Sequence, residues 1–458
     1  MIKFLLKFLF LLFVFLILVT VYISFFGIET DKFNNLIKEK ANKVNRYVKL
    51  EFNKTKIHLN PKELNLVVKL KNPKILAKEN EIILSKFDLF LPLESFFTSD
   101  FLLKRVELAF SKNDIKDLTK ITNIFLPRII NKQINKVFNK GTLEGEFTIP
   151  FKSDGTLGKN YGFSGKILNS SINVTKKIPL KNLTLEIKNV NKNNFNGFEA
   201  VIKNGSIYDL ELGGSVINLI FAENTIETNS SLVTKGKIDH SQLEKLLSLS
   251  SIKLDKFKNT KGEIDLNTNI NFNLSKNFKI KNLSYSTKGD IPYFEIETAE
   301  KKIIKKYLPD YNPKVVIKNS KINLINSKSN RLTNLVGAIK TNGYFDSFQI
   351  KEDFNYKDKN SNISGTLSLT NSKVQFSRLN YIKTTGEKSE MTFDLSFNQN
   401  KYYNINKLNF LSEKNKIFLT NIKLNKDFEI ENFKKLEVKT FKNDIKNNDF
   451  LVEKIIKL

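Results

Sequence analysis

The chain has 458 residues, 40% of them hydrophobic, enough for roughly two or three ordinary domains or one long repeated structure with a large buried surface. It contains no cysteine, which excludes a disulfide framework and any thiolate metal site. The formal net charge of +28 is spread along the chain as lysine, without the interleaved aromatic residues of single-strand binders, and this disfavours nucleic acid as a partner.

An uncharged apolar run occupies residues 8–26, between Lys7 and Glu29. As a helix it would be roughly 29 Å long, close to the roughly 30 Å hydrocarbon layer of a bilayer. A cleavable secretory signal is the alternative, because Lys3 and Lys7 precede the run. The run exceeds the roughly 7–15 residues of such a signal, however, and no small-x-small cleavage site follows it. We therefore predict an uncleaved transmembrane helix.

The basic tail, residues 1–7, is expected to stay in the cytoplasm while the long remainder crosses the membrane. No second apolar run follows. The sequence thus predicts a single-pass membrane protein, with its N-terminus in the cytoplasm and its bulk outside the cytoplasm. The lysine excess has two readings in this setting: a composition bias that replaces arginine by lysine, which we favour, or an attraction to anionic head groups.

The segment after the anchor changes its hydrophobic period. Residues 27–47 carry apolar side chains at helical spacing and are predicted to form a stalk helix, with a helix lying on the membrane surface as the alternative. From residue 48 the period becomes two, and Val48, Leu50 and Phe52 alternate with charged residues. Residues 48–112 are therefore predicted to be antiparallel strands with one apolar and one solvated face.

Residues 113–140 interrupt the strands with a second helical pattern, which Pro127 should kink and Gly141 should end. We expect this helical insertion to close one end of the core. Residues 141–458 return to alternation and form a repeated-strand region with short helices at 240–249 and 300–308. Four stretches begin with a glycine and then alternate between apolar and polar residues, and each is expected to form a strand. They begin at Gly141, Gly165, Gly262 and Gly365.

These patterns together predict a mainly β protein: a transmembrane helix followed by a long, curled antiparallel sheet of about 20–25 strands with a few short helices. The spacing of the glycine-led stretches is irregular, which excludes a strict solenoid repeat.

Catalytic and metal-binding patterns are missing from the sequence. The two histidines, His58 and His240, have no metal-ligand spacing around them. Residues 155–160 resemble a phosphate-binding loop only superficially, because Asn160 stands where Ser or Thr should bind magnesium. Glu144 and Glu146 are two apart on the solvated face of a predicted strand, not in a cleft. We therefore expect no enzyme activity, no cofactor and no metal.

The segments 64–76, 82–97 and 100–108, placed behind a single span and a helix, resemble the opening of the AsmA-like proteins, the AsmA, YhdP and TamB group, and most closely the YhdP branch. The resemblance is most specific over residues 1–112, and beyond them only the glycine-led, alternating strands match. It implies an inner-membrane-anchored envelope protein whose β-groove has an apolar interior and conducts phospholipids toward the outer membrane. The chain is shorter than the YhdP and TamB branches, so we expect a fragment or a shortened member.

This resemblance implies phospholipids as the ligand, the inner membrane as a partner, and outer-membrane or envelope proteins as further partners. The lining of the groove is expected to be Leu66, Val68, Val106, Leu108, Leu143, Phe147, Ile264, Leu266, Ile270, Phe272, Phe393 and Leu395. Two alternatives give the same alternation: a membrane-tethered β scaffold whose apolar faces close into a sandwich, and an outer-membrane assembly factor that offers strand edges.

The topology is directly testable. A reporter that is active only in the periplasm, fused after Leu458, should give a signal on a chain that retains residues 1–26. The length of the apolar run and the missing cleavage site are the reasons. A silent reporter, or a mature protein that begins near Gly27, would contradict this topology.

Overall fold

The computed structural model describes residues 2–453 apart from 32, 45–47, 78–79, 97–101, 119–137, 157, 159–161, 176–177, 193–194, 223–224, 248–256, 276–278, 299–301, 342, 399–401 and 426–429. The chain is mainly β, and 26 of its described strands belong to one sheet. The only other sheet among them is the two-stranded β21–β22. The described strands therefore provide no second large sheet that could face the first.

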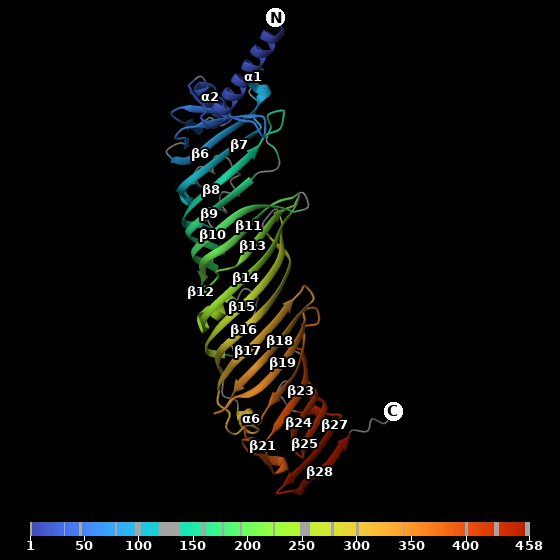
Figure 1. Ribbon diagram of the computed structural model, residues 1–458. Coiled ribbons are helices and arrows are strands. Elements are labelled where there is room, and N and C mark those ends of the chain that lie inside the picture. Colours follow the sequence, from blue (N-terminus) through green and yellow to red (C-terminus); the bar gives the residue numbers. More distant parts are fainter. Residues whose placement is uncertain are drawn as a thin grey trace. The chain divides into compact units, whose positions relative to one another are not determined.

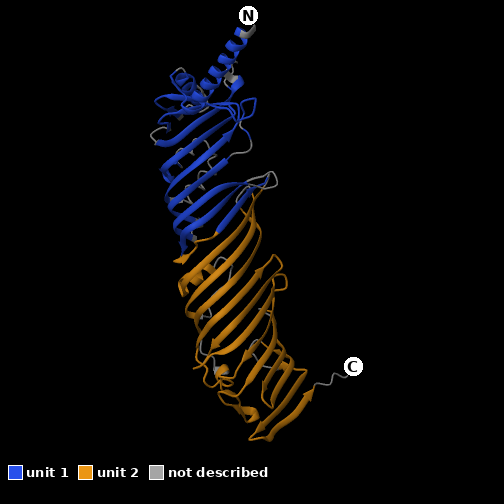
Figure 2. Ribbon diagram, viewed as in Figure 1, with its two compact units in different colours: residues 1–207, 216–223 blue, residues 208–215, 224–458 orange. Residues whose placement is uncertain are grey.

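Two compact units divide the chain, residues 1–207 with 216–223 and residues 208–215 with 224–458 (Figure 2). In each unit the strands are antiparallel and form a twisted, curved layer (Figure 1). The prediction of a mainly β chain with an N-terminal apolar helix and a long antiparallel sheet is thus confirmed. The number of strands in the sheet slightly exceeds the expected range.

The first unit begins with helix α1, Ile2–Phe25, which is long and apolar enough to span a membrane. It starts earlier than the predicted run. The next segment differs from the predicted stalk helix, because Ile28–Thr30 form strand β1, which pairs with β3, and only Asn34–Val44 form helix α2. Backbone hydrogen bonds to β3 outweigh helix propensity there. The turn between α1 and β1 places Gly27 at φ +67°, with His58 of β3 against it.

The remaining strands of unit 1 follow in chain order. They are β2 Val48–Glu51, β3 Thr55–Asn60, β4 Asn65–Leu70, β5 Lys74–Ala77, β6 Asn80–Pro92, β7 Arg105–Asp114, β8 Phe138–Pro150, β9 Gly162–Thr175, β10 Ile178–Lys192, β11 Phe195–Ile207 and β13 Val216–Phe221. From β6 to β11 each strand pairs with the next. Of the predicted helical insertion, residues 115–118 are helical and 119–137 lie outside the described residues.

Unit 2 is also built mainly from antiparallel strands. Its strands are β12 Leu210–Glu211, β14 Thr225–Asp239, β15 Phe257–Ser275, β16 Ile280–Thr298, β17 Lys314–Asn326, β18 Asn330–Lys340, β19 Asp346–Asn355, β20 Asn360–Ser368, β21 Val374–Phe376, β22 Tyr381–Lys383, β23 Ser389–Asn398, β24 Tyr402–Ser412, β25 Asn415–Leu424, β26 Ile430–Asn432, β27 Lys435–Lys442 and β28 Ile445–Glu453. Two short helices, α5 His240–Leu247 and α6 Lys302–Lys305, lie where helical breaks are predicted.

Asparagine has a structural role inside these strands. Asn182, Asn259 and Asn319 adopt left-handed backbone conformations with φ of 51°, 46° and 46°. Each lies at a shift in the pairing register, where one strand carries an extra residue. Asparagine tolerates this conformation better than other residues with a side chain. These bulges let long strands bend without losing the alternation of their faces.

The four glycines expected to open strands lie inside them instead, as Gly365 does in β20. Two of them, Gly262 and Gly365, face an aromatic ring on the neighbouring strand. A Cβ on Gly365 would lie 2.8 Å from the ζ carbon of Phe393, and one on Gly262 would lie 2.3 Å from a δ carbon of Phe294. The glycines thus make room for rings that lie flat across the sheet.

The substitution Gly365→Ala should destabilise unit 2 by about 1–3 kcal/mol, because the new methyl group overlaps Phe393 and the carbonyl oxygen of Gln349. Gly343→Ala is the matched control, since no atom lies within 4 Å of its added methyl group, and it should cost less than about 0.5 kcal/mol. Urea unfolding of the purified chain in detergent, followed by circular dichroism, measures both. Equal midpoints for the two variants would show that the glycine–ring contact does not matter.

Candidate functional site

The candidate site is the apolar face of the sheet, which the strand register defines. In unit 1, Val68 pairs with Leu89, Leu89 with Val106, and Val106 with Ile149. Paired residues in antiparallel strands share a face. The predicted lining residues of unit 1 all share this face, and they are Leu66, Val68, Val106, Leu108, Leu143 and Phe147.

Helix α2 covers part of the apolar face of unit 1. Its Ile37 is 5% exposed and belongs to one core cluster with Val68 and Val106, against which Leu66 and Leu108 also pack. A second cluster joins Leu118, from the described start of the helical insertion, to Ile82 and Leu84, with Leu143 packed against it. In this unit most of the predicted lining residues therefore contribute to a packed core.

In unit 2 the apolar face is built in the same way. Ile270 pairs with Tyr285, and further along the sheet Gly365 pairs with Phe393 and Ile363 with Leu395. The predicted lining residues of this unit share the face too, and they are Ile264, Leu266, Ile270, Phe272, Phe393 and Leu395.

Exposure separates this face from a closed core. Ile264 is 9% exposed, but the side chains of Leu266, Ile270, Phe272, Phe393 and Leu395 are all partly exposed. The register places four further apolar residues, beyond the predicted lining, on the same face. They are also partly exposed, and they are Ile322, Leu335, Ile350 and Leu408. This stretch of the apolar face of unit 2 is therefore only partly covered.

The C-terminal part of the same face is covered by a small lobe that contains the hairpin β21–β22. Val374 and Tyr381 of the hairpin pack with Leu369, Phe410, Ile417 and Val438, and these six side chains are at most 4% exposed. The rings of Phe376 and Tyr381 lie 5.6 and 6.2 Å from the ring of Phe410. The lobe therefore buries the apolar face completely where it sits.

The opposite face of the sheet is polar and carries cross-strand ion pairs. Glu186 of β10 binds Lys166 of β9 at 3.1 Å and Lys203 of β11 at 3.0 Å, and Lys235 binds Asp265 at 2.8 Å. All five side chains are well exposed, so each pair contributes little stability. Many lysines thus form an ordinary solvated face. A shallow hollow of about 640 Å³ on this face of unit 2 is lined mainly by Lys351, Asp353, Asn362, Asp394 and Asn406.

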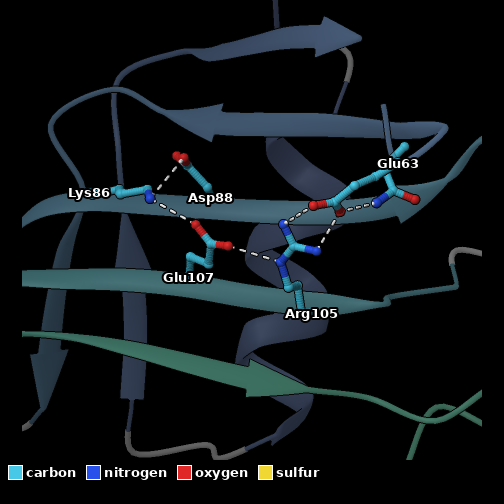
Figure 3. Close-up of polar contacts among 6 residues, drawn as sticks. Glu63, Lys86, Asp88, Arg105 and Glu107 are labelled. Carbon is cyan, nitrogen blue, oxygen red and sulfur yellow. Dashed lines mark hydrogen bonds and ion pairs between the residues drawn. The ribbon is translucent and has the colours of Figure 1, made fainter. Parts of the chain in front are cut away.

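A denser charge network lies on the polar face of unit 1 (Figure 3). Arg105 of β7 donates from Nη1 to Glu63 Oε2 at 2.6 Å and from Nε to Glu107 Oε1 at 2.9 Å. Glu107 also accepts from Lys86 Nζ at 2.8 Å. Lys86 lies 3.8 Å from Asp88, whose side chain is 8% exposed. The guanidinium of Arg105 also stacks on Phe90 at 3.7 Å from the ring centroid.

The carboxylates of this network have opposite pKa shifts. The hydrogen bond from Arg105 lowers the pKa of Glu63. For Glu107, burial alone would raise the pKa, but hydrogen bonds from Lys86 and Arg105 together lower it. Burial raises the pKa of Asp88, and the charge of Lys86 only partly opposes it. The charge network and the stacking of Arg105 on Phe90 together indicate a structural clamp between β6 and β7.

The two histidines of the chain each lie near an oxygen atom of another residue. The Nδ1 atom of His58 lies 3.4 Å from the carbonyl oxygen of Ser24, at the end of α1, and burial lowers the pKa of His58. The Nδ1 atom of His240 lies 3.2 Å from Thr260 Oγ1. Among the described residues, no group of three or more His, Asp or Glu could hold a metal ion.

Three residues with unusual settings were not singled out from the sequence. Arg331 and Glu352 form an ion pair on the apolar face of unit 2, and Lys383 is fully buried in the lobe. For Arg331 a signal exists, since the chain has only five arginines among 75 basic residues. Lys383 has no such signal among so many lysines.

The clamp predicts a pH dependence with a definite sign. Glu63 and Glu107 have lowered pKa values, so the stability they contribute is present above the ordinary carboxyl pKa of about 4 and is lost as the pH falls through their lowered values. Asp88 has a raised pKa and therefore opposes folding once the pH exceeds its ordinary value.

Glu107→Gln should accordingly destabilise the chain by about 1–3 kcal/mol at pH 7, because Lys86 and Arg105 lose their shared partner. The matched variant Asp88→Asn should leave stability within about 0.5 kcal/mol or increase it. Urea midpoints at pH 7 and pH 4 measure both effects. The cost of Glu107→Gln should shrink at the lower pH, and a larger cost for Asp88→Asn would contradict this view of the network.

Comparison with known proteins finds no similar protein. No protein-family model, no curated protein and no solved structure matches this chain. The resemblance of residues 1–112 to the AsmA-like opening therefore stays a prediction, and the function has to be inferred from the geometry of the two faces.

Proposed function

We propose that this chain is a membrane-anchored, lipid-handling protein of the AsmA-like type, located in the inner membrane with its sheet in the periplasm. The observation that carries the proposal is the partly exposed apolar face of unit 2, which lies on a single sheet whose other face is polar. A sandwich scaffold would bury the residues of this face between two sheets. The described strands contain no second sheet of that size.

Phospholipid acyl chains are the occupant that fits this face. They gain about 0.8 kcal/mol for each CH₂ group that leaves water, so they would prefer contact with Ile270, Leu335 or Leu395 to solvent. The apolar helix α1 supports the choice, because it would tether the chain to a bilayer, the natural source of such molecules. Head groups would stay at the solvated margin of the sheet.

The apolar face favours movement over tight retention of a lipid. Its aliphatic and aromatic side chains recur on successive strands at the spacing of about 4.8 Å, so neighbouring positions are nearly equivalent for an acyl chain. A lipid could slide between them without breaking specific contacts. We therefore propose transport of phospholipids between inner and outer membrane, with no chemical step.

A second candidate is an outer-membrane assembly factor that binds strands. Strand β28 is the last described strand of the sheet and pairs with β27. Its Ile445 and Leu451 are 74% and 54% exposed. Such an edge offers backbone hydrogen bonds to an added strand. The substitution Asp449→Pro should abolish the pairing of an added strand with β28 and leave lipid binding unchanged.

The lipid proposal predicts the effect of a charge on the apolar face. Ile270→Asp and Phe393→Asp should lower the phospholipid that co-purifies with the chain several-fold while the fold is kept, because a partly exposed face lets the carboxylate reach water. The controls are Asn269→Asp and Thr392→Asp, which place the same charge on the polar face of the same strands. Lipid extraction with mass spectrometry and circular dichroism measure the two quantities.

If the apolar-face variants unfold while the controls stay folded, the face is a closed core and the scaffold is correct. If wild-type chain carries only trace phospholipid, or if all four variants retain as much lipid as the wild type, the proposal is wrong.

A further inference from the structure

The apolar face of unit 2 carries a polar cluster beside the turns that join β17 to β18 and β19 to β20. Arg331 is the second residue of β18 and pairs across the sheet with Phe354 of β19, while Thr333 pairs with Glu352. The next pair in this register is Leu335 with Ile350. Arg331 and Glu352 therefore lie on the apolar face, at its margin, and not among the solvated lysines of the other face.

The two charged side chains are held in a defined arrangement. Arg331 Nη2 donates to both oxygens of Glu352, at 3.2 and 3.0 Å. Ser361 Oγ donates to Glu352 Oε1 at 3.1 Å. The guanidinium carbon of Arg331 lies 5.3 Å from the centroid of the Phe354 ring. The side chains of Arg331 and Glu352 are 19% and 23% exposed, so a ligand on this face could reach both.

Two tyrosines flank the pair. Tyr356 Oη donates to Asn326 Oδ1 at 2.5 Å, and Asn326 is the cross-strand partner of both Arg331 and Tyr285. Burial raises the pKa of Tyr285 above its ordinary value of about 10, against the opposing charge of Arg331. At neutral pH its phenol is protonated, as an unshifted phenol would be, and can donate a hydrogen bond. The margin of the apolar face is thus rich in donors at this position.

The pair is costly if its role is only structural. Removing two opposite charges from water consumes most of their mutual attraction, and apolar residues of similar size often stabilise a fold equally well. The chain also contains only five arginines beside its many lysines. Arginine differs from lysine in presenting a planar fork of donors that suits carboxylate and phosphate. At position 331, Nε and Nη1 have no acceptor in the described part of the chain.

We propose that Arg331 and Glu352 form a binding site for a zwitterionic phospholipid head group, with the phosphate bound by Arg331 and the ammonium bound by Glu352. The inference rests on the proposed function and names the head group that the apolar face selects. A pair of net charge zero matches a head group of net charge zero, whereas a purely anionic head group would face the carboxylate of Glu352. The acyl chains would extend over Leu335 and Ile350.

The test uses the full chain, purified in detergent and stripped of lipid. It is offered phosphatidylethanolamine, phosphatidylglycerol or diacylglycerol with identical acyl chains, and bound lipid is counted by native mass spectrometry. Wild type should prefer phosphatidylethanolamine to diacylglycerol by roughly tenfold, about the value of one charge-assisted hydrogen bond, and should prefer it to phosphatidylglycerol as well.

The decisive variant is the double substitution Arg331→Gln with Glu352→Gln. It removes both charges together and leaves neither one unpaired, so the fold should be kept. Its binding of the three lipids should become equal. The matched control is Lys416→Gln with Glu437→Gln, which removes a 2.7 Å ion pair from the polar face of unit 2 and should keep the preference of the wild type.

The outcomes separate this inference from the proposed function. Wild type that binds all three lipids equally would overturn the head-group site and leave the lipid face intact. A double variant that is folded and keeps the preference would show that the ion pair is structural. Absence of bound lipid in every chain would overturn the proposed function and the head-group site together.

Discussion

The period-two alternation of an antiparallel sheet is the constraint on which the rest of this structure depends. Because paired residues share a face, the register from β6 to β11 in unit 1 and from β14 to β25 in unit 2 gathers the apolar side chains on one side of each unit. A shift by one residue would move them all into water. The left-handed asparagines protect that register, since they absorb the extra residues that bend the strands.

An apolar sheet face has to be covered by protein or by a ligand, and the cover differs from one part of this face to another. In unit 1, Ile37 of α2 and Leu118 pack against the apolar face. In unit 2 the hairpin lobe covers the C-terminal part, and Lys383 closes the lobe by donating to three carbonyl oxygens at 2.5, 2.8 and 2.8 Å. Burial lowers the pKa of this lysine. The stretch around Ile270 and Phe393 has only partial cover, and it is where the proposed lipid would lie.

Several of the chain's lysines lie on the polar face of the sheet. Lysines such as Lys166 and Lys235 lie across from carboxylates and remain well exposed, as a solvated sheet requires. Two of the five arginines behave differently. Arg105 binds two carboxylates at once on the polar face, and Arg331 binds one carboxylate with a single nitrogen on the apolar face.

The sequence by itself determined the transmembrane-type helix, the antiparallel sheet and the face to which each predicted lining residue belongs, because helix length and alternation are local properties. It did not determine that residues 28–30 pair with β3, that the glycines lie under aromatic rings, or that α2 packs on Val68 and Val106. Nor did it separate the covered from the uncovered part of the apolar face, or bring Arg331 next to Glu352. Those features depend on contacts between strands distant in the chain, and identical alternation is compatible with a buried face and with an open one. Only the tertiary structure decides which apolar residues find a partner.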